Sequence, residues 1–207
     1  MSYRRALEAQ KKGWFDAEIP PLKMKTRKGE TIVKLDDEPA NVKFDKIPSL
    51  RAAFVKEGTV TAANSSKLND GASALVVMAA KMAVQPLARI VDYSTASKDP
   101  AWFTAAPADA ISRLLEKTGL TEDDIDLYEI NEAFAVVVLA VNQIPGLDVE
   151  KVNIAGGAVA LGHPIGASGA RILTTLLHNL MCTGGKRGIA SLCIGGGEAV
   201  AVLVEMM

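Results

Sequence analysis

The sequence has few of the side chains that usually carry chemistry, with two cysteines and two histidines among 207 residues. Two cysteines at unrelated positions make no disulfide framework, which favours reduced thiols in a cytoplasmic protein. The net charge is −1 and no basic block occurs, so neither nucleic acid nor an anionic membrane surface is indicated as a partner. The longest apolar runs, such as residues 133–141, are too short to span a bilayer, and the polar N-terminus is not typical of a signal peptide.

What the sequence does have is a globular balance, with 49% apolar and 23% charged residues. Its length suffices for one large domain, or for one domain and part of another. Beyond Gly58, apolar strand patterns alternate with helical patterns, which predicts a layered α/β sheet. Strands are expected over residues 72–80, 88–94, 127–130, 152–155, 188–194 and 199–205, and helices over residues 107–118, 133–142 and 167–181. Glycines alone join the last two strands, so these two should pair antiparallel.

The first 58 residues have a different character. A polar helix is expected over residues 3–12, and a short helix over residues 50–56 that Gly58 closes. Between them lies a segment rich in proline, glycine and charge, with one possible strand over residues 31–33. A segment of this kind cannot fold alone, so it is expected to lie on another body.

Two segments at expected strand-to-helix junctions could bind a ligand. In Asn131-Glu132-Ala133-Phe134, the amide and the carboxylate would face the crevice beyond the carboxyl ends of the strands. A helix cap and a favourable helix dipole explain Asn131 and Glu132 equally simply, and the sequence alone favours that structural role. In the second segment, residues 162–171, His163 lies among glycines that leave the backbone bare, and this favours a functional role.

The third segment is Cys193-Ile194-Gly195-Gly196-Gly197, at the end of an expected strand. Cys193 is a poor core residue because three glycines follow it, and a thiol can act as acid or base when its neighbours tune its pKa. Cys182, near a helix end, is better explained as an ordinary small apolar residue. His178, in mid-helix, is expected to be a surface or packing residue.

These three segments, in this order, resemble the signature blocks of the thiolase family, the acetyl-CoA acetyltransferases. A fourth match runs over residues 58–66 and 68–72. The resemblance covers essentially the whole chain. It implies a thiolase-like layered α/β fold with a mixed five-stranded sheet flanked by helices. It also implies reversible acyl transfer between coenzyme A thioesters, with coenzyme A as substrate and no permanently bound cofactor or metal.

The resemblance also implies roles for single residues. In relatives, the residue that matches Cys193 moves a proton on and off the acetyl methyl group. The residue that matches His163 helps to activate the nucleophile and faces the thioester oxygen. Asn131 would hold a water beside His163, the N–H of Gly195 would serve a second oxyanion hole, and Glu132 would orient its neighbours. Coenzyme A contacts are implied for Leu50, Phe54, Ala62, Ser66, Leu68, Ala133, Phe134 and Ile165, and Phe103 matches a position that walls a small acyl pocket.

The sequence departs from the family in one large respect. Thiolases are about twice as long and carry their nucleophilic cysteine in the first half, whereas no cysteine precedes Cys182 here. The chain is therefore expected to be a fragment, or one subunit of a split thiolase whose partner chain supplies that cysteine within a heterotetramer or larger assembly. Residues 1–58 would be a remnant of the coenzyme-binding loop domain, residues 59–86 the closing strand and helix of the N-terminal half-domain, and residues 87–207 the C-terminal domain.

Several alternatives stay open. The chain could be a non-catalytic scaffold or coenzyme-binding subunit, although an intact set of Asn131, His163 and Cys193 argues against that. A third alternative is a decarboxylating condensing enzyme of the same superfamily, which is disfavoured because such enzymes generally lack the thiol followed by glycines.

Two smaller departures from the family concern coenzyme A binding. Lys67 replaces the usual glycine and could bind phosphate or point to solvent, and residues 37–41 lack the arginine that often stacks on adenine. An apolar strand over residues 72–80 would leave a large apolar face exposed.

Overall fold

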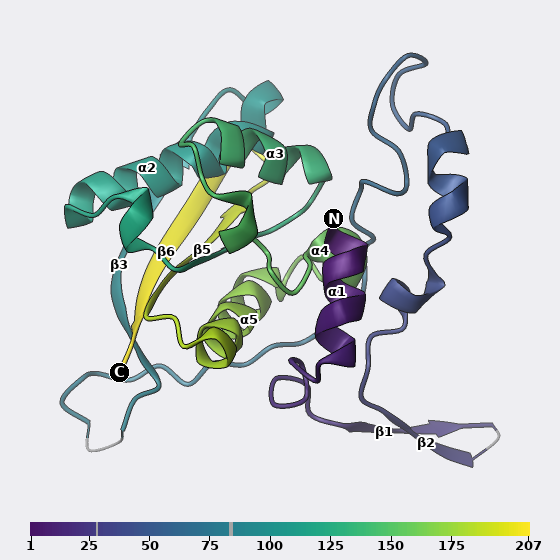
Figure 1. The fold of residues 1–207 in the computed structure, drawn as a ribbon, viewed down its shortest axis with the longest axis horizontal. Helices are drawn as coiled ribbons and strands as arrows, with labels where there is room; N and C mark the ends of the chain where they lie inside the picture. The colour runs from purple at the N-terminus through teal and green to yellow at the C-terminus, as the bar shows by residue number, and fades with distance from the viewer. Residues whose placement is uncertain (28, 83–84) are drawn as a thin grey trace.

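The computed structural model describes residues 1–27, 29–82 and 85–207. Residues 88 onward form a mixed sheet with helices on both faces, which confirms the predicted fold class (Figure 1). The strands are β3 (Ala88–Ser97), β4 (Leu127–Ile130), β5 (Arg187–Cys193) and β6 (Glu198–Met206), in the order β3-β6-β5-β4. β6 is antiparallel to β3 and β5, as predicted for the last two strands, and β4 runs parallel to β5.

Helices cover the two faces of this sheet. α2 (Ala106–Thr118) and α3 (Ala135–Gln143) lie on one face, and α5 (Ser168–Thr183) lies on the other (Figure 1). The predicted signals explain the ends of α2, because Pro107 fits its first turn and Gly119 caps it with a left-handed φ of 68°. No helix among the described residues is long and apolar enough to cross a membrane.

The core consists of two apolar layers, one on each side of the sheet. Ile111, Leu114 and Tyr128 belong to the layer beneath α2 and α3. Leu176 and Leu180 of α5 belong to the opposite layer. β5 is nearly continuous in apolar and small residues because side chains on both of its faces are buried. The site described below therefore stands on a rigid, two-sided support.

The sheet has four strands, so the expected fifth strand over residues 152–155 is wrong. Only one bridge, between Tyr128 and Val152, remains of it. Asn153 has a positive φ of 49°, which ends any extended run. Its side chain bonds both the N–H and the C=O of Ile130, at 2.8 Å each, and so takes over the pairing that a strand would have made.

The first 58 residues lie against this body as a separate layer of short elements (Figure 1). α1 (Ser2–Lys11) packs beside α4 (Ala158–Leu161), and the predicted strand over 31–33 is part of β2 (Gly29–Val33). β2 pairs with β1 (Leu22–Thr26) in a projecting hairpin, which the sequence did not indicate. Arg5 of α1 fastens the layer to the body by donating to the carbonyl oxygens of residues 149 and 152.

The helix expected over residues 50–56 is wrong, since this segment forms turns. The Ala53 N–H donates to the Val60 carbonyl oxygen at 2.7 Å, and the Gly58 N–H donates to the Val55 carbonyl oxygen at 2.9 Å. The chain therefore doubles back on itself, and the Ala53 N–H is used in this turn instead of in a helix. Two short 3-10 turns, η1 (Glu38–Asn41) and η2 (Phe44–Ser49), precede it.

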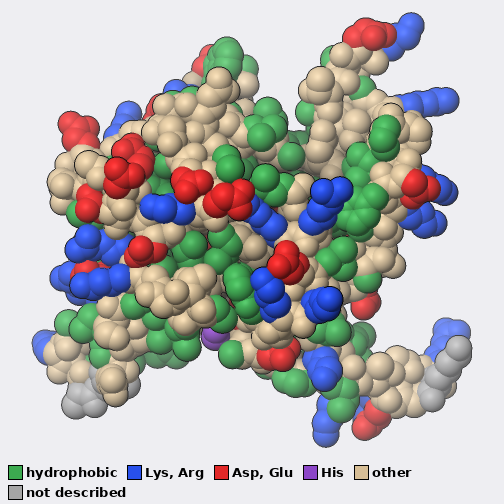
Figure 2. Space-filling view, in the orientation of Figure 1, with side chains coloured by type: hydrophobic (Ala, Val, Ile, Leu, Met, Phe, Trp, Pro, Cys, Tyr) green, Lys and Arg blue, Asp and Glu red, His purple; other side chains and the backbone are tan. Residues whose placement is uncertain are grey.

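The strand expected over residues 72–80 is also wrong for this chain. The segment is irregular and runs past α5 toward β3 (Figure 1). Val76 is 87% exposed and Val77 is 72% exposed, so the expected exposure of apolar side chains is present. Figure 2 shows apolar side chains gathered along the same lower margin of the molecule. A strand needs a neighbour for its backbone groups, and no strand of the described ranges lies beside this one. The closing helix expected before residue 86 falls partly outside those ranges.

Candidate active site

An amide and a thiol lie at the carboxyl ends of two neighbouring strands of the sheet. Asn131 directly follows β4, and Cys193 ends β5, the parallel strand beside it. The Asn131 N–H donates to the Ser191 carbonyl oxygen at 2.9 Å, which extends the pairing of these strands. Because parallel strands end at the same edge, this is where an α/β sheet usually binds its ligand.

His163 reaches the same edge from the loop before α5. Its Nε2 lies 3.3 Å from Nδ2 of Asn131. Its backbone N–H donates to the Lys67 carbonyl oxygen at 2.8 Å, which pairs this loop with the segment around Leu68. Gly162 gives the loop its shape with a φ of 90°, and an added Cβ there would lie 2.4 Å from the Asn69 side chain.

The structural explanation of Asn131 and Glu132 as a helix cap and a dipole partner is wrong. The N-cap position of α3 is Phe134, and Asn131 is 1% exposed with an Oδ1 that has no hydrogen-bond partner in the described chain. Glu132 is buried and accepts hydrogen bonds from the Asn153 amide at 3.3 Å and the Val159 N–H at 3.2 Å. Glu132 is therefore a fixed support, and Asn131 offers an unused polar atom to the site.

The two titratable groups at this edge are both uncharged near neutral pH. Burial lowers the pKa of His163, and the positive charge of Arg171 lowers it further. Burial raises the pKa of the Cys193 thiol. Cys193 therefore holds its proton at rest, and His163 is a neutral imidazole that can act as donor and acceptor at once.

The segment around Ser66 lies against the loop that carries Asn131. Ser66 donates to the Ala133 carbonyl oxygen through both its N–H, at 3.1 Å, and its hydroxyl, at 2.9 Å. The Ala135 N–H donates to the Asn64 carbonyl oxygen at 2.8 Å. These bonds bring together two segments that lie far apart in the sequence, and both carry predicted coenzyme A contacts.

Three phenylalanines from different segments meet beside this contact. The ring centroid of Phe134 is 5.9 Å from that of Phe54 and 6.4 Å from that of Phe103, both edge to face. The predicted contact positions and the predicted acyl-pocket wall thus form one aromatic cluster. The remaining predicted contacts are exposed side chains, namely Leu50, Ala62, Leu68 and Ile165.

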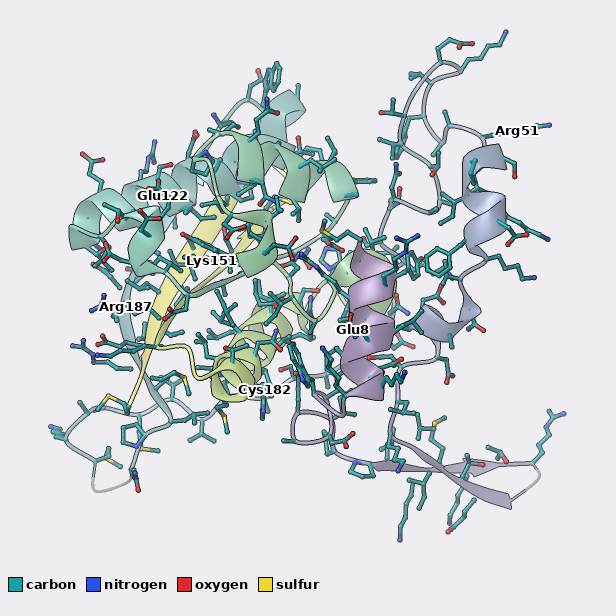
Figure 3. The ribbon with its side chains drawn as sticks, viewed as in Figure 1. Glu8, Arg51, Glu122, Lys151, Cys182 and Arg187 are labelled. Atoms are coloured by element: carbon teal, nitrogen blue, oxygen red, sulfur yellow. The ribbon has the colours of Figure 1, made fainter. Side chains whose placement is uncertain are left out.

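The glycine turn after Cys193 leaves one backbone donor open. The N–H groups of Gly196 and Gly197 turn back to the Ile194 carbonyl oxygen, at 3.1 and 3.3 Å. The Gly195 N–H is exposed and has no acceptor within the described ranges. Cys182 lies on α5, away from this turn, and is exposed (Figure 3).

Lys67 is more than half exposed, and its Nζ also lies 2.5 Å from Oε1 of Glu38 in η1. An exposed ion pair of this kind is weak, so both a solvent-facing role and phosphate binding stay predictions. Two other residues escaped the sequence analysis. Ser168 contacts His163 and stands inside the same glycine-rich motif, so the motif itself could have pointed to it. Asn153 supports Glu132 and β4 through tertiary contacts, for which the sequence holds no signal.

The fold and this edge define an α/β protein whose strand ends carry a thiol, an imidazole and a buried amide. Comparison with known families identifies the class. The model "Thiolase, N-terminal domain" matches residues 1–81, and "Thiolase, C-terminal domain" matches residues 84–206. The chain belongs to the thiolase family, as predicted, and its relatives are acetyl-CoA acetyltransferases.

Individual relatives agree with this assignment. The probable acetyl-CoA acetyltransferase of Dictyostelium discoideum is 50% identical over 211 residues, covering 100% of this chain and 51% of the relative. The Bacillus anthracis acetyl-CoA acetyltransferase structure matches 100% of this chain and 54% of its own, with a TM-score of 0.95 and 47% identity. An Ascaris suum thiolase in complex with coenzyme A matches 100% of this chain and 53% of its own, with a TM-score of 0.87 and 43% identity. The chain spans about half the length of these relatives.

Proposed function

We propose that this chain catalyses reversible acyl transfer between coenzyme A thioesters, together with a separate N-terminal-half chain that carries the nucleophilic cysteine. The observation that carries the proposal is the contact between Asn131 and His163 at the strand edge where Cys193 ends β5. The aromatic cluster around Phe134 supports a coenzyme-binding role for the neighbouring segments. A cytoplasmic location and a heterotetramer or larger assembly remain predictions.

The proposed chemistry divides between two thiols. The partner's cysteine thiolate attacks one thioester and keeps its acyl group, while the departing coenzyme A thiolate takes the proton of Cys193. The Cys193 thiolate then takes a proton from the methyl group of a second acetyl-CoA, and the resulting carbanion attacks the acyl carbon as the partner's thiolate leaves. His163 and a water held by Asn131 face the enolate-like oxygen, and the Gly195 N–H faces the tetrahedral oxyanion. Glu132, fixed by Asn153, keeps the loop in place.

A reconstitution experiment tests this proposal. The purified chain alone is expected to show no thiolysis of acetoacetyl-CoA, because its only thiols are Cys182 and Cys193. Addition of an N-terminal thiolase half is expected to restore turnover. Turnover by the chain alone would refute the need for a partner. An inactive complex with a properly acylated partner would refute the catalytic role.

The alternative is a non-catalytic scaffold or coenzyme-binding subunit. The presence of Asn131, His163 and Cys193 at one edge of the sheet argues against it, since a scaffold needs neither the imidazole nor the thiol there. Cys193→Ser in the assembled complex separates the two proposals. Unchanged turnover in this variant would favour the scaffold.

The exposed, irregular segment over residues 72–82 is the proposed docking segment for the partner. Val76→Glu is expected to weaken complex formation about tenfold or more, or roughly 1.4 kcal/mol, because it places a charge in an apolar contact. Val149→Glu, at an exposed valine outside this segment, is the matched control. Titration by calorimetry or light scattering measures both. Equal affinity of the two variants for the partner would contradict this docking site.

A further inference from the structure

Ser168 stands behind the imidazole of His163 at the start of α5. Its Oγ lies 2.6 Å from Nδ1 of His163 and 3.1 Å from the Pro164 carbonyl oxygen. The side chain is fully buried, with 0% exposure, so water does not compete for its hydroxyl. This hydroxyl has one proton, which can serve either neighbour but not both at full strength.

The hydrogen bonds that the Pro164 carbonyl oxygen already accepts indicate which neighbour receives the Ser168 hydroxyl proton. The Pro164 carbonyl oxygen already accepts the N–H groups of Ala167 and Ser168, each at 2.8 Å. Two N–H donors occupy the two lone pairs of a carbonyl oxygen, so a third donor at 3.1 Å gains little. Nδ1 of His163, which is also the nearer atom, is therefore the better acceptor for the hydroxyl proton.

The opposite side of the ring faces the Asn131 amide, whose orientation must match the tautomer. If Nδ1 accepts from Ser168, a neutral imidazole carries its own proton on Nε2. The Asn131 side chain faces Nε2 at 3.3 Å, which is long for a hydrogen bond, and its buried Oδ1 has no partner in the described chain. A proton on Nε2 therefore requires the Asn131 amide to be turned by half a turn, so that Oδ1 accepts from Nε2 and Nδ2 faces the site.

We propose that Ser168 is a positioning residue, which donates its hydroxyl proton to Nδ1 of His163 and thereby keeps the imidazole proton on Nε2, the nitrogen that faces Asn131. Its catalytic consequence rests on the proposed acyl transfer, in which Nε2–H is the group that can donate to the thioester oxygen. The tautomer itself depends only on the chain.

Nitrogen-15 NMR of the labelled full chain tests the tautomer directly. The protein has two histidines, so His178→Gln leaves a single imidazole to observe. At neutral pH we expect protonated Nε2 and unprotonated Nδ1 in His163. A proton on Nδ1 would overturn the proposal, whatever the activity of the protein.

Ser168→Ala adds a test of the residue itself. The variant is expected to lose the fixed tautomer and to show a mixture of both forms. Thr174→Ala is the matched control, since Thr174 is a half-buried hydroxyl of the same helix that bonds Ala170 and Ser73. An unchanged tautomer in folded Ser168→Ala would overturn the role of Ser168.

In the assembled complex, Ser168→Ala is expected to lower kcat about 10- to 100-fold with little change in KM, the usual cost of losing a partner that orients a histidine. An unaltered kcat in a variant with a mixed tautomer would overturn the catalytic part of the proposal. If even the unmutated complex is inactive, the proposed acyl transfer fails, while the NMR result still decides the tautomer.

Discussion

Cys193→Ala is expected to slow cleavage and formation of the carbon–carbon bond about 10³-fold in the assembled complex, the range in which general acid–base groups contribute. Cys193 ends β5, next to the strand that Asn131 follows, and the fold offers no second thiol at this edge within the described ranges. Thiolysis of acetoacetyl-CoA under saturating substrate measures the effect. Cys182→Ala, at the exposed thiol on α5, should leave the rate unchanged.

The same variant should keep the first half of the reaction. Transfer of an acetyl group to the partner's cysteine breaks no carbon–hydrogen bond, and solvent can protonate the departing coenzyme A thiolate when Cys193 is absent. Exchange of labelled coenzyme A into acetyl-CoA should therefore be slowed far less than thiolysis. Loss of this exchange together with thiolysis would show that Cys193→Ala damages the site rather than its proton transfer. Equal thiolysis rates for the alanine variant and the unmutated complex would refute the assigned role.

Sequence patterns predicted the parts of the fold that depend on local signals. The alternation of apolar segments located β4, β5 and β6, and the glycines between the last two strands indicated their antiparallel pairing. Pro107 and Gly119 fix the backbone at the two ends of α2 by their own conformational preferences. These signals act within a few residues, which is why they can be read without the fold.

The errors arise where a distant partner decides the local structure. The strand over residues 72–80 needs a neighbour to pair with, and its apolar residues alone do not make one. Residues 152–155 lose their strand to the side chain of Asn153, which bonds Ile130 from 23 positions away. The cap role assigned to Asn131 fails for the same reason, because its contact with His163 exists only in the folded chain.

A buried carboxyl group next to the site offers the largest expected effect on stability. Glu129 of β4 is 2% exposed, and burial raises its pKa to about 8. Asn179 donates to its Oε1 at 3.0 Å, and the guanidinium of Arg171 favours its charged form. Nη1 of Arg171 lies 4.0 Å from Oε2, too far for a hydrogen bond, so this attraction does not offset the loss of hydration.

The sign of the resulting pH dependence follows from linkage. The folded chain binds the Glu129 proton more tightly than the unfolded chain, whose carboxyl has an ordinary pKa of 4.5. Its stabilising effect is therefore complete below about pH 4.5 and is lost as the pH rises toward about 8. From about pH 5.5 to about pH 7.5, the free energy of unfolding should fall by about 2–3 kcal/mol from this group, at about 1.4 kcal/mol per pH unit.

Glu129→Gln should remove that slope, because glutamine keeps an acceptor for Asn179 but cannot titrate. Urea unfolding of both proteins at the two pH values measures the change. Glu18 and Asp36, whose pKa values burial also raises, add slope of the same sign, and His163, whose pKa is lowered, opposes it. Asp36 and His163 are present in both proteins, so the difference between the slopes reports Glu129 together with its coupling to Glu18. Glu116→Gln, at an exposed carboxylate of α2, is the control and should keep the original dependence of unfolding free energy on pH. The same dependence in all three proteins would contradict a raised pKa at Glu129.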